Sequence, residues 1–456
     1  MKLIYNVDDK PKFGQLIIFA IQQLLAIMAA TLVVPVIVGN GMSSAAALFG
    51  AGVGTLIYVA FTKKKSPVFL GSSFAFIGSM FAAFAGATSI ALGYLGIILG
   101  AFFAGLVYVV IALIVKFAGV KWINKLMPAV VIGPTVSIIG LSLAGNAIGD
   151  LTSGGLKVDN VSVASPYVAL ICGLVTLFVV CISSVYGKKM GKLIPFIIGI
   201  LSGYAVATVF TVIGNVAGID ALKVIDFSHI TSLFADGITI KSFLQVPDFT
   251  FLTAFGGIKE LSGTYVVTLI AAYVPVAFVV FAEHIADHKN ISSIIEKDLL
   301  EDPGLSRTLL GDGVGSMAGA IFGGCPNTTY GESVGCVAIT KNASVYTIIT
   351  AAIMAMVISF ISPFVAFVNS IPSCVMGGVC VALYGFIAVS GLKMVQKVDL
   401  EDNRNLFVVS AIFIAGIGGL TLKFGNVEIT TIACALILGI VLNIILSKKK
   451  TEEISE

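Results

Sequence analysis

Long runs of apolar residues follow one another along the chain from Phe13 to Leu446, separated by short polar stretches. A helix needs about 20 apolar residues to cross a bilayer, so this pattern predicts about fourteen membrane segments. Two of the segments are short and interrupted, and the others are continuous. The predicted spans are 13–38, 44–62, 68–85, 90–116, 127–146, 166–186, 193–216, 262–286, 308–324, 327–340, 345–369, 372–392, 405–421 and 427–447.

The two interrupted segments are Val68–Gly78 and Gly323–Gly335, which are crowded with Gly, Ser, Thr or Pro. Non-helical backbone at membrane depth is tolerated only where protein or a water-filled cavity satisfies its polar groups. Each segment is therefore predicted to be a short extended stretch followed by a half-helix. Ser72 and Ser73 are expected to cap a half-helix that starts near Phe74. The stretch 326–329 (PNTT) is expected to cap one that starts near Tyr330.

The composition supports an all-α polytopic membrane protein. Of the 456 residues, 58% are hydrophobic and 11% are charged, and the mean hydropathy is +1.06. Soluble domains average roughly 25% charged residues, so a soluble fold is excluded. The first apolar run lacks a small-residue cleavage site and is predicted to be a helix, not a signal peptide. No stretch is long and polar enough for a soluble domain.

The positive charges test the predicted topology. With the N-terminus inside, 22 of the 27 Lys and Arg residues fall on the cytoplasmic side. Such a bias follows the positive-inside rule, and removing either interrupted segment would reverse every later loop. Both interrupted segments are therefore predicted to cross the membrane, with both termini cytoplasmic. The basic residues predicted outside are Lys157, Lys223, Lys241, Lys259 and Lys423.

The loop Ala217–Leu261 divides the chain into two halves of seven segments each. An odd number of segments inverts the second half relative to the first, which predicts a 7+7 inverted repeat. Segments 3 and 10, the two interrupted ones, then occupy corresponding positions. Paired interruptions of this kind are the best sequence pointer to a transporter's binding site. Simple packing kinks without a ligand are the alternative.

Glu283 and Glu332 are candidate functional residues because carboxylates inside membrane segments are costly and usually functional. Capping of the half-helix is the alternative for Glu332, and solvation at the interface is the alternative for Glu283. Asp287 lies four residues after Glu283 on the same helix face, as a supporting group or as a solvated one. His284 points about 100° away from Glu283. His288 falls at the predicted membrane edge.

Gln22 and Gln23 in the first segment are expected either to hydrogen-bond between helices or to support Glu283. The sequence carries no Walker, HExxH or GxSxG motif and no zinc-ligand spacing, so no enzymatic activity, metal or cofactor is predicted. Nothing in it indicates nucleic-acid binding. The Gly50–Gly54 stretch is predicted to pack helices closely. The seven cysteines are predicted to be small apolar packing residues. Cys325 is the one possible exception, because it lies beside the second interrupted segment.

Six stretches of the sequence resemble the nucleobase–cation symporter-2 (nucleobase–ascorbate transporter) family, and within it the bacterial uracil permeases. The resemblance implies fourteen helices, with a core domain of helices 1–4 and 8–11 (residues 1–126 and 262–370). It also implies a gate domain of helices 5–7 and 12–14 (residues 127–261 and 371–447), followed by a cytoplasmic tail (448–456). The stretches are Leu70–Phe76, Ala282–Ile285, Lys297–Leu305, Pro326–Glu332, Val375–Val379 and Leu383–Gly385.

The resemblance also implies a substrate site. Glu283 and Glu332 would accept hydrogen bonds from the ring N–H groups of a pyrimidine, and backbone amides near Phe74 and Gly331 would meet its carbonyl groups. Uracil has two N–H donors and two carbonyl acceptors, which match two carboxylates and two half-helix N-termini. Three further residues would line the pocket: Ala30, Tyr330 and Tyr384.

Three positions depart from the family pattern: Gln23 stands where many relatives have His, Ala286–Asp287 replaces Gly-His, and Ser333 replaces Asn. The expected function is proton-coupled import of uracil across a bacterial cytoplasmic membrane, with Glu283, Asp287 and His284 as candidates for the proton. A purine permease, a passive channel and a membrane receptor are the alternatives. A homodimer through the gate domain is implied by the family alone.

Overall fold

The computed structural model describes residues 3–119, 128–158, 161–188, 190–235, 237–424 and 427–447. The predicted tail 448–456 and the predicted core–gate boundary at residues 126 and 127 lie outside these ranges.

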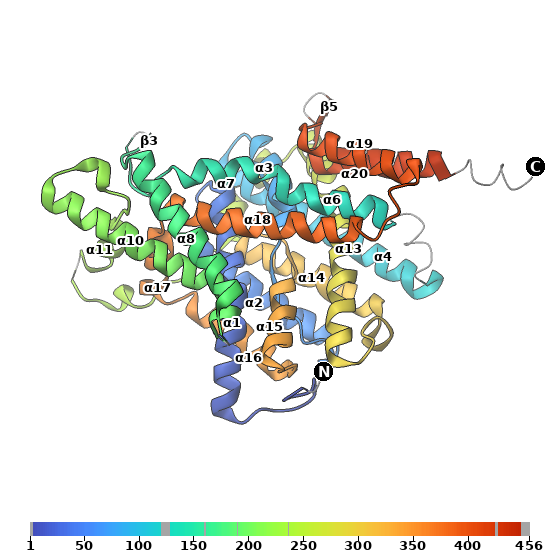
Figure 1. Cartoon of the computed structure of the whole chain (residues 1–456), viewed down its shortest axis with the longest axis horizontal. Coiled ribbons are helices and arrows are strands. Elements are labelled where there is room, and N and C mark those ends of the chain that lie inside the picture. Colours follow the sequence, from blue (N-terminus) through green and yellow to red (C-terminus); the bar gives the residue numbers. More distant parts are fainter. Residues whose placement is uncertain are drawn as a thin grey trace, which may run out of the picture.

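Apolar helices make up most of the described chain (Figure 1). The longer helices are α1 (Phe13–Val38), α2 (Ser44–Phe61), α3 (Ile77–Ala85), α4 (Ile90–Ala118), α6 (Ala129–Ser142), α7 (Ala144–Leu151), α8 (Pro166–Tyr186), α10 (Pro195–Ala217), α13 (Gly263–Ile295), α14 (Leu305–Gly323), α15 (Gly331–Thr340), α16 (Val345–Ile358), α17 (Ser362–Ser370), α18 (Ser373–Val395), α19 (Asn403–Ile417) and α20 (Thr431–Ser447). The shorter ones are η1 (Phe74–Phe76), α9 (Met190–Leu193), η2 (Asp220–Leu222), α11 (Ser228–Thr231), η3 (Ser232–Phe234), η4 (Ile240–Ser242), α12 (Thr250–Ala254), η5 (Phe255–Glu260) and η6 (Leu300–Gly304).

Three short antiparallel strand pairs complete the described structure. β1 (Leu70–Ser72) pairs with β4 (Asn327–Thr329), β2 (Lys157–Val158) with β3 (Val161–Ser162), and β5 (Leu422–Phe424) with β6 (Val427–Ile429). β1 and β4 are the two predicted interruptions, and each is followed by a half-helix. The predicted all-helical fold with two interrupted segments is therefore confirmed.

Eight helices in the described ranges are long and apolar enough to cross a membrane. Shorter apolar helices stand at other predicted segments, among them 74–85, 345–358, 403–417 and 431–447. The count of fourteen spans and the domain boundaries stay predictions.

Two helices have bounds that differ from the predicted membrane spans. α13 continues to Ile295 instead of ending near residue 286. It continues because His288, Ile291 and Ile295 are all buried, so its inward face persists at helical spacing beyond the apolar run. The last segment, predicted from residue 427, begins at Thr431 because β6 precedes it.

The helices pack in two groups. In one group, α14 lies against α2 and α4, α13 lies against α4, and α16 lies against α1 and α2. In the other, α18 lies against α6, α7 and α8, α10 lies against α8, and α19 lies against α6 and α20. α6 and α18 run side by side across the view in Figure 1.

Close packing of α2 on α14 depends on glycine. A Cβ atom at Gly50 would lie 2.4 Å from the carbonyl oxygen of Gly319, and one at Gly54 would lie 2.7 Å from that of Gly315. Both helices thus place glycines four residues apart at their contact, as is common in membrane helix pairs. The predicted packing role of the Gly50–Gly54 stretch is confirmed.

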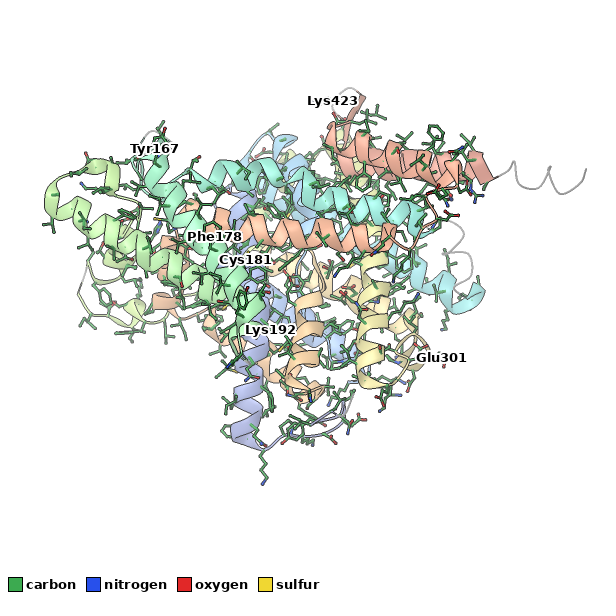
Figure 2. The ribbon with its side chains drawn as sticks, in the orientation of Figure 1. Tyr167, Phe178, Cys181, Lys192, Glu301 and Lys423 are labelled. Atoms are coloured by element: carbon green, nitrogen blue, oxygen red, sulfur yellow. The ribbon has the colours of Figure 1, made fainter. Side chains whose placement is uncertain are left out.

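Large apolar side chains are exposed on the outer faces of the helices. On α8, which is labelled with Tyr167 near its start in Figure 2, Tyr167 and Phe178 are 79% and 57% exposed. A soluble protein does not leave so much apolar surface in water. These faces are suited to lipid.

Candidate substrate-binding site

The two interrupted segments meet in the interior of the protein. β1 and β4 pair antiparallel, with Leu70 opposite Thr329 and Ser72 opposite Asn327. α2 holds both strands: the Thr55 hydroxyl bonds to the backbone of Leu70, and the Asn327 amide donates to the carbonyl oxygen of Gly50 at 3.0 Å. The Thr55 bonds satisfy backbone groups of Leu70 that a plain helix would have satisfied internally, and the Asn327 bond fixes β4 on α2.

A half-helix follows each strand. η1 and α3 follow β1, and α15 follows β4. The residues at the N-cap positions are Ser73 and Tyr330, both with extended backbone. Neither side chain accepts a hydrogen bond from the first turn of its half-helix, so the predicted capping by side chains is wrong. The first-turn N–H groups of a helix have no partner within the helix, so both half-helices present open donors and a partial positive charge.

A cavity of about 410 Å³ lies in front of these two half-helices. Its polar wall comes from the segment around η1, from α13 and from β4 with the start of α15. Its apolar wall comes from α6, α10 and α18. The residues of the polar wall are Ser73, Phe74, Ala75, Glu283, Ala286, Asp287, Asn290, Thr328, Thr329, Tyr330, Gly331 and Glu332.

Five of the seven predicted substrate-binding residues line this cavity: Glu283, Glu332, Phe74, Gly331 and Tyr330. The other two do not. Ala30 is buried in the apolar cluster that includes Tyr330, and the buried Tyr384 ring packs edge-on against Phe74, with ring centroids 6.1 Å apart. Asp287 also lines the cavity, whereas His284 is fully buried away from it.

Three carboxyl groups therefore share one cavity. Glu283 and Asp287 stand one turn apart on α13, and Glu332 stands in the first turn of α15. The Thr329 hydroxyl donates to Asp287 Oδ2 at 2.9 Å, which ties α13 to β4. Among the described residues, no salt bridge involves any of the three acids. Within this part of the chain no positively charged side chain neutralises them, so they are suited to accept hydrogen bonds from N–H donors of a ligand.

Behind Glu332, two of the positions that depart from the family pattern touch each other. The Gln23 side-chain amide donates to Ser333 Oγ at 2.5 Å, and the backbone N–H of Phe69 donates to the same oxygen at 2.9 Å. Gln23 thus bonds between helices and supports the residue next to Glu332. Of the two roles expected for it, the structure records the interhelical bond.

Sequence reasoning missed Asp312 and Asn290. Asp312 is a fully buried acid on α14 and lies 2.6 Å from Nδ1 of His284. The rule that singled out Glu283 and Glu332 applies to it equally, since it stands inside a predicted membrane segment. Asn290 lines the cavity one turn beyond Ala286, and its signal was its place on the same helix face as Glu283.

The sequence also matches known proteins. Residues 14–425 match the model of a permease family. The chain is 38% identical to the uracil permease of Bacillus caldolyticus over 98% of this chain and 95% of that protein. It is 36% identical to the uracil permease of Bacillus subtilis (99% and 97%) and 34% identical to that of Escherichia coli K12 (96% and 93%).

The chain belongs to this permease family. Together with its apolar helices, membership makes it a multi-pass membrane protein of a family of transporters. Solved structures share the fold at low identity. The transmembrane domain of the cyanobacterial bicarbonate transporter BicA matches with a TM-score of 0.62 and 14% identity over 96% of this chain and 100% of that one. SLC26A9 matches with a TM-score of 0.67 and 11% identity over 97% and 67%.

Proposed function

We propose that this permease imports uracil together with a proton across the bacterial cytoplasmic membrane. The relatives at 34–38% identity that span nearly the whole chain are uracil permeases. The observation that carries the proposal is the polar wall of the cavity, where Glu283 and Glu332 face the same space as two open half-helix N-termini.

This arrangement complements uracil group by group. The two carboxylates accept hydrogen bonds from the two ring N–H groups, and the backbone donors near Phe74 and Gly331 meet the two carbonyl oxygens. Each of these bonds joins a charged or dipolar group of the site to the ligand, and bonds to charged groups are stronger than bonds between neutral ones. A base that lacks one of these groups leaves a polar group of the site unpaired and is rejected.

The position of the cavity supports a proposal for how transport proceeds. Its lining residues on α13 are Glu283, Ala286, Asp287 and Asn290, and those on α18 run from Leu383 to Met394. Both sets lie in the second halves of their helices, which the charge distribution predicts to be cytoplasmic. We take this conformation to be open to the cytoplasm, with import completed by movement of the polar-wall helices against α6, α10 and α18.

A proton supplies the driving force in this proposal. Uracil is neutral near pH 7, so the membrane potential alone does not concentrate it, whereas one co-transported proton contributes about 2.3 kcal/mol per 100 mV. Glu283 is the residue that we propose to load that proton from the cavity side. A Glu283→Gln variant that accumulates uracil against its gradient with normal acidification of the lumen contradicts this role.

Uptake of labelled uracil into proteoliposomes with an imposed pH gradient tests the function. We expect accumulation above equilibrium, collapse of accumulation with a protonophore, and competition by unlabelled uracil. Stronger competition by xanthine or guanine than by uracil would assign a purine substrate, which a cavity of about 410 Å³ also admits. Equilibration without accumulation would assign a passive channel.

A further inference from the structure

α13 carries a second polar face beside the one that lines the cavity. His284 and His288 stand four residues apart on this face, and both are fully buried. Consecutive residues lie about 100° apart around a helix, so this face is adjacent to that of Glu283 and Asp287. α14 contributes Thr308 and Asp312, which are also fully buried and reach His284 with their side chains. Four polar side chains are thus enclosed next to the site but outside its cavity.

The bonds of His284 define two hydrogen-bond patterns. Nδ1 lies 2.6 Å from Asp312 Oδ2, and Nε2 lies 3.0 Å from the hydroxyl oxygen of Thr308. That hydroxyl also lies 3.1 Å from the carbonyl oxygen of Leu305. A hydroxyl has a single hydrogen, so Thr308 donates either to Leu305 or to His284, but not to both at once.

The two patterns differ by one proton. When Thr308 donates to Leu305, it accepts the Nε2–H of His284, and a further proton lies between Nδ1 and Asp312, so that the pair is neutral overall. When Thr308 donates to Nε2, Nδ1–H donates to the Asp312 carboxylate, and the pair carries one negative charge. Rotation of one hydroxyl group is the only rearrangement needed to pass between them.

The neighbouring groups favour His284 over His288 as the partner of this proton. Nδ1 of His288 donates to the carbonyl oxygen of His284 at 2.7 Å, and its Nε2 lies 2.6 Å from the hydroxyl of Tyr58, so no carboxylate faces it. The two imidazole rings stack with centroids 4.0 Å apart, where two positive charges would repel each other. At most one of the two rings is charged at a time.

Other titratable groups around the pair come from three helices: Glu283 and Asp287 from α13, Tyr108 from α4 and Tyr58 from α2. Among the described residues, Asp312 Oδ1 has no hydrogen-bond partner. An ionised carboxylate oxygen left in that condition is costly, so the surroundings favour the protonated pattern.

We propose that the His284–Asp312 pair, with Thr308 as its hydroxyl switch, is a reversible proton-binding site linked to the substrate cavity. This inference rests on the proton coupling of the proposed function. Proton uptake by the pair removes one negative charge next to Glu283 and Asp287. It therefore stabilises the negative charge that remains on these acids after Glu283 has loaded its proton, and this charge strengthens the hydrogen bonds that they accept from the substrate. Linkage is reciprocal, so uracil binding draws a proton onto the pair.

Proton uptake on uracil binding to the purified protein, in weakly buffered solution with a pH indicator, tests the inference. We expect the unmodified protein to take up a proton, and Asp312→Asn to bind uracil with at least a twofold lower uptake per uracil bound. Thr308→Val is expected to shift the pH of half-maximal uptake, and Thr308→Ser to restore it. Ser316→Ala, a buried serine one turn along α14, is the matched control and should behave as the unmodified protein.

Transport gives a second measurement. In proteoliposomes, Asp312→Asn is expected to retain uracil exchange within about threefold and to lose accumulation driven by a pH gradient. Unchanged proton uptake and accumulation in Asp312→Asn overturns the inference. If that variant does not fold, an unshifted uptake profile in Thr308→Val overturns it instead. An unmodified protein that binds uracil without proton uptake overturns both this inference and the proton coupling, whereas failure to bind uracil contradicts the proposed substrate itself.

Discussion

The two interrupted segments share a backbone plan and differ in their side chains. β1 and β4 are each three residues long, and each leads into a half-helix without a side-chain cap. The first segment gives the cavity Ser73, Phe74 and Ala75. The second gives it two threonines, Tyr330 and Glu332. The backbone donors are therefore doubled, whereas the only carboxylate within either segment lies on the second.

The second segment also holds the first in place. The Tyr330 hydroxyl donates to the carbonyl oxygen of Ser72 at 2.5 Å, and Ser333 Oγ accepts the backbone N–H of Phe69. Thr329 reaches Asp287 on α13. Each of these side chains of the second segment bonds to another element. Substitutions in the second segment should accordingly weaken uracil binding and lower the Tm more than equivalent substitutions in the first.

Glu332→Gln is the substitution with the largest expected effect. A hydrogen bond to a charged acceptor contributes about 2 kcal/mol, so the dissociation constant of uracil should rise about 30-fold. Isothermal titration of the purified protein with uracil measures this change. The control is Ser73→Ala at the cap position of the first half-helix, for which a change below threefold is expected. An equal loss of uracil affinity in the two variants would contradict the larger contribution of the second segment.

Gly71→Ala tests the contact between the segments. A Cβ atom at Gly71 would lie 2.3 Å from Cε2 of Tyr330 and 2.9 Å from Oγ1 of Thr31, so the ring must move and its bond to Ser72 is lost. Overpacking of this kind costs about 1–3 kcal/mol, and we expect a lower Tm and at least fivefold weaker uracil binding.

Gly78→Ala is the matched control for Gly71→Ala, because nothing lies within 4 Å of the added Cβ in α3. Alanine is the better helix former, so this variant should keep or slightly raise the Tm. A Gly71→Ala variant that behaves like Gly78→Ala would show that the Tyr330 ring is not packed against Gly71.

The sequence was sufficient to predict the interruptions but not how they meet. Gly, Ser, Thr and Pro within apolar runs excluded plain helices at both places, and Glu332 stood out as an intramembrane acid. The pairing of Leu70 with Thr329 joins residues more than 250 positions apart, and no local pattern encodes that register. The capping prediction failed for a related reason: the Thr329 hydroxyl bonds to Asp287 on another helix instead of capping its own.

The same limit applies to the buried pair behind α13. His284 was singled out for its neighbour Glu283, and Asp312 met the same intramembrane criterion without being singled out. Their contact at 2.6 Å spans 28 residues and depends on how α13 and α14 both pack against α4. Sequence predicts which residue types are costly in a membrane, whereas packing decides which of them share a proton.

Thr329→Val removes the bond between the second segment and Asp287 while it keeps the side-chain shape. The 2.9 Å bond is to a carboxylate, and its loss should weaken uracil binding about fivefold, equivalent to about 1 kcal/mol. Thr329→Ser keeps the hydroxyl and serves as the control. Binding by the valine variant that matches the serine variant would mean that the Asp287 position does not depend on Thr329.

Ser72→Ala should have the smallest effect, and its counterpart Ser333→Ala sharpens the comparison. Ser72 Oγ is buried with no hydrogen-bond partner among the described residues, although the Cys325 thiol, a weak partner at best, lies beside it. Removing such a hydroxyl is neutral or stabilising, so the Tm and uracil binding should stay within error or rise. Ser333→Ala leaves the Gln23 amide and the Phe69 N–H without their acceptor, which costs about 1–3 kcal/mol and lowers the Tm. The same change of serine to alanine thus separates a segment that contributes mainly backbone from one whose side chains hold the site together, and a thermal melt of both variants decides it.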